Sequence, residues 1–381
     1  MCTPENVRRV AVEAAAKPRT SRRAVLAGGL GTAAAMGLSL PASAAAHPRP
    51  SAGRTPLELV LLGTRGGLPP SSDRSGIASV VTVEGRNYQI DCGYASAWQY
   101  QRAGLKRQDL AGIFITHLHA DHVADYYNTI LMGAVTGLPY LDVVPDNVPA
   151  YGPGPAGGLP DKWGGGTAPT INPANPTPGL VEMTNSLHAA YAYSSNVFMR
   201  DAGMRDISEL VTPHEIVISE VGASPRGDTA PRMSPFVVME DDRVRVSATL
   251  VPHGPVYPSF AYRFDTDHGS VTFSGDTRKS ENLIELAAET DILVHEAISD
   301  PAEVGISGPI LTHMLESHVL VDEVGTIAQA AAAKHLVLSH LGDFTGEIKR
   351  GKWQRAAQRG YSGKVTVGED LQRIPLRHRR R

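Results

Sequence analysis

The sequence is poor in cysteine and in aromatic residues, and it carries little net charge. Only two of its 381 residues are cysteine, Cys2 and Cys92, which excludes the disulfide framework typical of small secreted domains. Aromatic residues make up 6%, yet 42% of all residues are hydrophobic, which is enough for a sizeable core in one or two domains. The motif G-x-x-x-x-G-K-[ST] is absent as well, so a P-loop is excluded.

A long uncharged run occurs near the start of the chain. Arg22 and Arg23 precede an uncharged stretch over 24–46, in which Ala42 and Ala44 form an A-x-A cleavage pattern. Because glycine and proline interrupt this run, it predicts a cleaved twin-arginine signal peptide over residues 1–46 rather than a membrane anchor. We therefore expect the twin-arginine export machinery as a partner, and a periplasmic or extracellular protein. Replacing both arginines by lysine should trap the precursor in the cytoplasm.

Export would make the mature chain more acidic. Removal of residues 1–44 takes away six of the 36 basic and two of the 39 acidic residues, and leaves a net charge of −7. A net acidic protein has no overall attraction for nucleic acid. The same cleavage removes Cys2 and leaves Cys92 without a partner in its own chain. The last residues, 377–381, read RHRRR and are expected to be a solvated basic tail.

Strand-like and helix-like segments alternate through the rest of the chain. Residues 57–67 resemble a strand, 78–93 a hairpin about Glu84-Gly85, and 121–136 a helix, and the second half repeats this order weakly. The alternation predicts an α/β domain over 55–376, built from two packed sheets flanked by helices. An insertion over about 139–235 interrupts the domain. Its Pro/Gly-rich part, 145–180, is expected to lie outside the regular core, and 181–210 to be helical.

Three histidines and an aspartate lie within six positions at the end of one predicted strand. An apolar run leads into FITHLHADH (114–122), which contains His117, His119, Asp121 and His122. Side chains two apart in an extended strand leave on the same side, so His117 and His119 can share one metal ion. Asp121 and His122 fall on the following turn and point to a neighbouring position. H-x-H-x-D-H therefore predicts two adjacent metal sites.

Three polar residues in the second half of the chain also follow apolar runs. His253 follows SATLVP, Asp276 follows VTFSG and His340 follows KHLVLS, so all three stand where strand ends can meet at one rim. The expected ligand sets are His117, His119 and His253 for one ion, Asp121, His122 and His340 for the other, and Asp276 as the bridge. Imidazole and carboxylate ligands favour two Zn²⁺ ions, with Mn²⁺ or Fe²⁺ as open alternatives. The remaining histidines considered are read as surface side chains or discounted: His47, His188, His214, His268, His313 and His378.

The order of these motifs resembles that of the metallo-β-lactamase-fold hydrolases. The segments LLGTRGGLPP, YQIDCG, AYGPGP, FSGDT and ILVHEA look like the branch that contains ribonuclease Z and a group of arylsulfatases. The resemblance runs from about Leu57 to about Leu376. It implies an αββα sandwich with a dinuclear site along one edge, carrying a Pro/Gly-rich and helical lid insertion. It also implies that the seven residues above bind zinc, with Asp276 bridging.

The same resemblance assigns roles in proton transfer. The segment ESHVLVDEVGTIAQAA matches the family segment that carries a proton-donating histidine, so His318 is expected to protonate the leaving group. Glu296 in ILVHEA is expected to orient His318, and Asp121 to orient or deprotonate the metal-bound hydroxide. Two departures stand out: SHVL lacks the Ser/Thr pair of the family, and Ile298 replaces a threonine.

The expected function is hydrolysis of a small sulfate or phosphate ester, of the arylsulfatase or phosphodiesterase kind, by a metal-bridged hydroxide. The alternatives are a ribonuclease Z-type endoribonuclease that processes tRNA 3′ ends, a lactonase or β-lactamase, and a non-catalytic binding protein.

The composition of the insertion favours a small-molecule ester over nucleic acid as the substrate. Residues 139–215 contain three basic residues against eight acidic ones, whereas affinity for nucleic acid rests on neutralising phosphates. Aromatic and methionine side chains in 187–204 would either pack as an ordinary helix or cover a small aryl leaving group. A homodimer remains open.

Overall fold

The computed structural model describes residues 55–134, 142–145 and 147–376. The predicted signal segment 1–46 and the basic tail 377–381 lie outside these residues, so both stay predictions. The described residues all belong to one compact unit. None of their helices combines the length and the apolar character that a membrane span requires.

The first sheet has seven strands in the order β14-β1-β2-β3-β4-β5-β6. Neighbours from β14 to β3 are antiparallel, and neighbours from β3 to β6 are parallel. The predicted hairpin is present, and its turn residues Glu84 and Gly85 both have positive φ angles, as a tight two-residue hairpin turn requires. The strand bounds are β1 Leu57–Gly63, β2 Ala78–Val83, β3 Arg86–Ile90, β4 Leu110–Phe114, β5 Val148–Pro153, β6 Val211–Ile216 and β14 Arg373–Leu376.

The second sheet repeats this plan with the order β13-β12-β11-β10-β9-β8-β7. Neighbours from β7 to β10 are antiparallel, and neighbours from β10 to β13 are parallel. The weak repetition in the sequence therefore corresponds to two sheets of the same construction. The strand bounds are β7 Phe236–Glu240, β8 Arg245–Leu250, β9 Phe260–Thr266, β10 Gly269–Phe273, β11 Ile292–Ile298, β12 His335–Gly342 and β13 Lys364–Val367.

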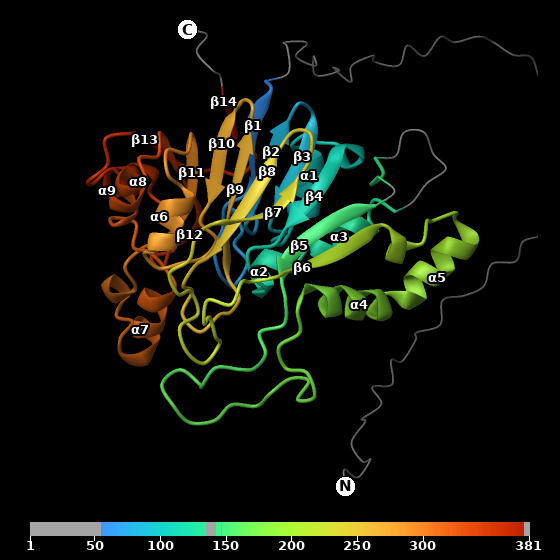
Figure 1. Ribbon diagram of the computed structural model, residues 1–381, viewed down its shortest axis with the longest axis horizontal. Helices are drawn as coiled ribbons and strands as arrows, with labels where there is room; N and C mark the ends of the chain where they lie inside the picture. Colours follow the sequence, from blue (N-terminus) through green and yellow to red (C-terminus); the bar gives the residue numbers. More distant parts are fainter. Residues whose placement is uncertain (1–54, 135–141, 146, 377–381) are drawn as a thin grey trace, which may run out of the picture. The chain divides into compact units, whose positions relative to one another are not determined.

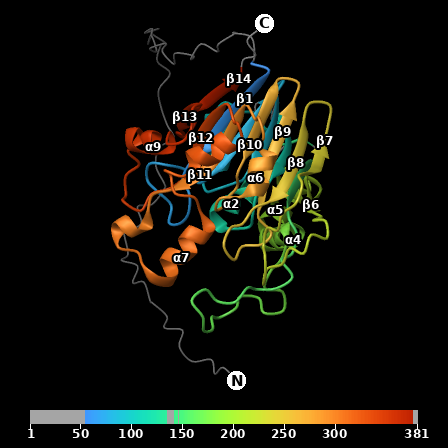
Figure 2. The same cartoon turned by 60° about the vertical axis from the view of Figure 1, so that its left-hand side comes forward.

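The two sheets pack face to face, and helices cover their outer faces (Figures 1 and 2). Phe114 lies at the centre of the shared core, where its ring contacts Tyr151, Tyr262 and Phe264 at centroid distances of 5.1–5.7 Å. Separate apolar clusters join each sheet to its own helices. The helices that pack on the sheets are α1 Ser96–Arg102, α3 Tyr126–Leu131 and α4 Leu180–Ala190 on the first, and α6 Glu281–Leu286, α8 Val324–Ala330 and α9 Arg350–Ala357 on the second. The expected αββα sandwich is confirmed.

The predicted single helix over 121–136 was wrong. Two short helices, α2 Ala120–Val123 and α3, stand there instead, and residues 135 and 136 lie outside the described part. The break falls at Asp125, whose backbone N–H donates to the Cys92 carbonyl and whose carboxylate accepts from the Ala97 N–H. Contacts with the β3–α1 connection therefore override the local helical pattern.

The insertion is more regular than its composition predicts. Residues 148–153 form strand β5 between β4 and β6, with Val148 and Ala150 fully buried, so excluding all of 145–180 from the core was wrong. The two prolines of β5, Pro149 and Pro153, concealed the alternation of buried positions. The predicted helix over 181–210 is present as three pieces, α4, α5 Ala192–Asp201 and a 3₁₀ turn over Ile207–Glu209. Helix α7, Gly308–Ser317, was not predicted.

Candidate metal centre

The H-x-H-x-D-H segment crosses the edge of the first sheet between β4 and α2. Asp91, just beyond β3, accepts hydrogen bonds from the Thr116 N–H at 2.8 Å and from His122 Nδ1 at 2.8 Å. Because His122 donates through Nδ1, its Nε2 is the nitrogen that faces the site and can bind a metal ion once it is deprotonated. Asp91 holds a left-handed backbone conformation with φ of 56°, which aspartate adopts more readily than most residues.

One cluster of possible ligands consists of His117, His119 and His253. One nitrogen from each side chain lies within 4.8 Å of the others. His253 donates through Nδ1 to the Ser317 carbonyl at 2.8 Å, so its Nε2 is left as the acceptor. That Nε2 lies 3.3 Å from His119 Nδ1, which can donate a hydrogen bond to it. A cation bound by these nitrogens would replace this hydrogen bond.

A second cluster consists of Asp121, His122 and His340, again with ligand atoms within 4.8 Å of one another. Asp276 lies between the two clusters. Its oxygens are 3.1 Å from His340 Nε2 and 3.4 Å from His122 Nε2 on one side, and 3.8 Å from His253 Nε2 on the other. This is the position from which one carboxylate can bridge two ions.

The donor atoms of the site fit a dinuclear centre. His117 Nε2, His122 Nε2 and Asp276 Oδ1 are buried without a hydrogen-bond partner among the described residues. Buried polar atoms are nearly always satisfied, so three such atoms converging on one point mark a place for cations. The set contains only imidazole nitrogens and carboxylate oxygens, which transition metals such as zinc accept.

The two clusters differ in their protonation. Burial and the neighbouring imidazoles hold the pKa of His117 well below its ordinary value, and burial also lowers the pKa values of His119 and His253. Burial opposes protonation of His340, but Asp276 and Asp121 outweigh it and raise the pKa to about 10. Asp276 and Asp91 likewise outweigh burial and raise the pKa of His122 well above its ordinary value. The first cluster therefore offers neutral imidazoles, whereas an ion at the second must displace protons from His122 and His340, and its binding weakens as the pH falls.

A glycine pair after β1 packs directly against the second cluster. The backbone N–H of Gly67 donates to Asp121 Oδ2 at 2.8 Å. A Cβ on Gly66 would lie 2.5 Å from His340 Nδ1, so only glycine allows the backbone to approach that ring. The segment LGTRGG is thus a tight turn that supports two ligands. Phosphate binding is not needed to explain its glycines.

His318 and Glu296 lie beside the ligands, as the family resemblance implies. His318 Nδ1 is 3.4 Å from Glu296 Oε2, and its ring lies 5.0 Å from His253 and 5.9 Å from His340, centroid to centroid. Glu296 Oε1 accepts a hydrogen bond from the Val319 N–H at 2.8 Å, which holds the carboxylate in place. Burial lowers the pKa of His318, but the Glu296 charge outweighs it and the pKa is raised overall.

The four described histidines that were read as surface side chains lie elsewhere. His188 bonds to the Tyr127 hydroxyl, His214 stacks on Tyr151, His268 pairs with Glu84 and His313 contacts Trp163. His47 and His378 lie outside the described residues. The roles of Asp91 and the Ser317 carbonyl were missed. Asp91 could have been found, because it follows a strand in YQIDCG as Asp276 does in VTFSGD.

Comparison with known proteins agrees with this description. The chain is 28% identical over 326 residues to a ribonuclease Z of Mycobacterium bovis (strain BCG / Pasteur 1173P2), which covers 85% of this chain and 100% of that protein. A ribonuclease Z of Mycobacterium tuberculosis (strain ATCC 25618 / H37Rv) is 27% identical over the same share of this chain and 100% of its own. Residues 57–130 match the family described as Anti-Pycsar protein Apyc1.

Solved structures share the fold at low sequence identity. The metallo-beta-lactamase fold protein YhfI from Bacillus subtilis superposes with a TM-score of 0.54 at 15% identity, over 84% of this chain and 99% of that one. Human tRNase Z, short form, superposes with a TM-score of 0.57 at 20% identity, over 84% and 99%.

Fold and site together define the protein as a metal-dependent hydrolase of the metallo-β-lactamase fold. Within that class it is a homologue of proteins named ribonuclease Z. The structure brings the seven expected ligands together, and their metal ligation stays a prediction.

Proposed function

We propose that the protein is a phosphodiesterase of the ribonuclease Z type, with two metal ions held by the residues of the rim. The observation that carries this proposal is the pair of ligand clusters sharing Asp276, with His318 and Glu296 beside them. The relatives named ribonuclease Z support a phosphodiester in RNA as the substrate, more strongly than they support the small sulfate or phosphate ester expected from the sequence.

The metal ions and the protein side chains would contribute different parts of the reaction. Two bound cations would lower the pKa of a water held between them and neutralise charge on the phosphoryl oxygens. Asp121, held by the Gly67 N–H, is placed to orient that water. His318 holds a proton beside the site and delivers it to the departing oxygen, and Glu296 keeps the imidazole protonated and aimed.

Zinc suits the donor set best. The five imidazoles and two carboxylates of the site form a nitrogen- and oxygen-rich set without sulfur, in which Mg²⁺ or Ca²⁺ would find too few oxygens. Manganese and iron accept the same donors, so the native ion has to be identified in protein purified without added metal.

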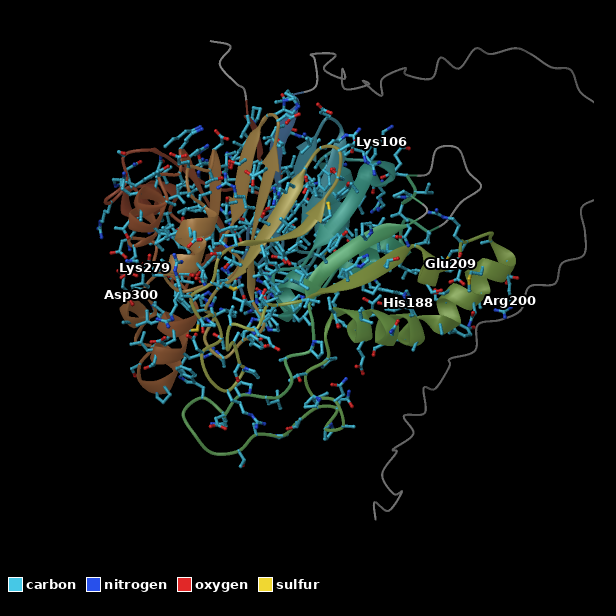
Figure 3. The ribbon with its side chains drawn as sticks, in the orientation of Figure 1. Lys106, His188, Arg200, Glu209, Lys279 and Asp300 are labelled. Atoms are coloured by element: carbon cyan, nitrogen blue, oxygen red, sulfur yellow. The ribbon has the colours of Figure 1, made fainter. Side chains whose placement is uncertain are left out.

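A small phosphate or sulfate ester is the second candidate. The acidic insertion favours it, because residues 139–215 carry three basic and eight acidic residues. Helix α5, on which Figure 3 labels Arg200, extends beyond the first sheet, whereas α4 packs on it. If the substrate is RNA, this part of the insertion would have to approach a polyanion although the insertion itself is negatively charged.

One set of assays separates these candidates. Zinc-loaded protein is incubated with a precursor tRNA carrying a 3′ extension, with bis(4-nitrophenyl) phosphate and with 4-nitrophenyl sulfate. A ribonuclease Z-type enzyme should cut the RNA at its 3′ side and leave the sulfate intact. Turnover of bis(4-nitrophenyl) phosphate without RNA cleavage would select the small phosphodiester. Hydrolysis of the sulfate alone would contradict the phosphodiesterase proposal, with Asp276→Ala as the inactive control for every substrate.

A further inference from the structure

A cavity of about 370 Å³ opens beside the first ligand cluster. His119, an exposed member of that cluster, lies at its wall together with the adjacent Leu118. No other charged or titratable group except the Tyr257 hydroxyl lines it among the described residues. A cavity of this size next to a reaction centre is large enough for one ring system of a substrate.

The walls of the cavity are mostly apolar and stiff. Seven of its 17 lining residues are proline, contributed by both ends of the stretch 153–178 and by the segments around residues 225 and 255–258. Proline offers CH₂ groups and no N–H donor, and its ring fixes the backbone. Leu159, Met183 and Val256 add side chains of the same character. The cavity is therefore preformed for an uncharged group.

The two ends of the irregular segment 154–179 are held in contact. A Cβ on Gly179 would lie 2.6 Å from the Pro155 nitrogen and 2.2 Å from Glu215 Oε1, so these ends touch. Glu215 Oε1 also accepts a hydrogen bond from the Val181 N–H at 3.1 Å. The base of the insertion is thus fixed where it forms the cavity.

The outer part of the same segment reaches the other side of the metal centre. Trp163 donates through Nε1 to the Pro309 carbonyl at 2.8 Å, and its ring contacts His313 edge to face at 5.3 Å. Both contacts are on α7, the helix that ends next to His318. Figures 1 and 2 show the segment running from β5 past α7 and back to α4. The segment therefore extends from the cavity to the helix that precedes the predicted proton donor.

We propose that this cavity, the proline pocket, binds an uncharged planar ring on the substrate, carried by the substituent that stays on phosphorus. The inference rests on the proposed phosphodiesterase function. His318, which serves the departing oxygen, does not line the proline pocket, so the leaving group lies elsewhere. Arg226 stands near the rim, but its guanidinium donates to the Leu159 carbonyl at 3.2 Å and is exposed. An aryl group and a nucleobase share the chemistry that this pocket accepts.

The test keeps the leaving group constant and varies the other substituent. Zinc-loaded protein is given 4-nitrophenyl phosphodiesters whose second substituent is methyl, 1-naphthylmethyl or 5′-thymidyl. We expect kcat/KM to rise roughly 10-fold or more from methyl to at least one ring substituent, mainly through KM, because the ring is bound alike before and during reaction. A gain for naphthylmethyl alone identifies an aryl ring, and an equal gain for thymidyl a base. Equal kcat/KM for all three would overturn the proposal.

Uncharged polar substitutions locate the effect. Leu159→Asn and Met183→Gln should each reduce the preference for the ring substituent over methyl roughly 10-fold. Leu159 is 42% exposed, so the folded protein tolerates its loss. Ile171→Asn is the matched control, because Ile171 lies on the same segment, is 89% exposed and does not line the pocket. A variant at Leu159 that keeps the full preference would contradict the assignment.

A binding measurement separates this inference from the proposed function. The ligand 1-naphthylmethylphosphonate has no ester bond to cleave, and its binding is measured by calorimetry. Leu159→Asn should weaken it roughly 10-fold, whereas Ile171→Asn should not. If no phosphodiester is turned over but this binding pattern holds, the function fails and the proline pocket stands. If phosphodiesters are turned over without any dependence on Leu159 in binding or rate, the function stands and the pocket fails.

Discussion

Replacing Asp276 by alanine should lower turnover by about 10³-fold or more and reduce the metal content from two ions per chain to one or none. Asp276 is the side chain that both clusters share, with oxygens 3.1 Å from His340 Nε2 and 3.8 Å from His253 Nε2. Without it, each ion loses a ligand and the clusters lose the charge that holds two cations together. Metal assistance is worth several kcal/mol, and each 1.36 kcal/mol is a factor of ten in rate.

Elemental analysis of the purified variant and a phosphodiesterase assay measure the two effects. Asp265→Ala is the matched control, because Asp265 lies on β9 of the same sheet, is half exposed and pairs with Arg263 at the surface. It should keep two ions and full activity. Two ions per chain in Asp276→Ala, with unchanged turnover, would show that the bridge is not part of the centre.

Replacing His318 by alanine should slow hydrolysis selectively for substrates with poor leaving groups. The imidazole lies beside both clusters and is held by Glu296, so it is placed to give a proton to the departing oxygen. General acid help is worth roughly 10²–10⁴-fold for an alkoxide leaving group. A nitrophenolate leaves without protonation, so its rate should fall much less. Metal content should be unchanged, because His318 belongs to neither expected ligand set.

Two further variants make this result interpretable. His268→Ala, in the turn between β9 and β10, should behave as the wild type on every substrate. Glu296→Gln removes the charge that raises the pKa of His318. The wild type should lose activity as the pH rises through that pKa, and in Glu296→Gln this loss should move to lower pH. An equal rate loss for good and poor leaving groups in His318→Ala, together with loss of metal, would instead make His318 a ligand.

The sequence was sufficient to predict the ligand-bearing segments because each follows an apolar strand. In an α/β sandwich the ends of such strands meet at one edge, so His117, His253, Asp276 and His340 could be placed together without coordinates. Two sheets of equal construction were visible as a weak repetition. These features are local patterns repeated along the chain, which is why they survive without tertiary information.

Other features depend on contacts between distant segments and could not be predicted. The helix expected over 121–136 breaks at Asp125 because of hydrogen bonds to the β3–α1 connection. Strand β5 looked irregular because two of its six residues are proline, and only pairing with β4 and β6 makes it a strand. The proline pocket needs five separate stretches of the chain to meet. None of these arrangements leaves a periodic signal in the sequence.

Cys92 is a free, buried thiol and the single cysteine of the described residues, so no disulfide joins the two sheets there. The ligand clusters supply the missing connection: His119 and His253 are 134 positions apart, and Asp121 and His340 are 219 apart. A bound cation is thus a reversible cross-link between distant parts of the chain. Ions that bind only the folded state stabilise it by about 4 kcal/mol at a free concentration a thousand times Kd. The melting temperature of this protein should therefore rise with the concentration of free metal ion around it.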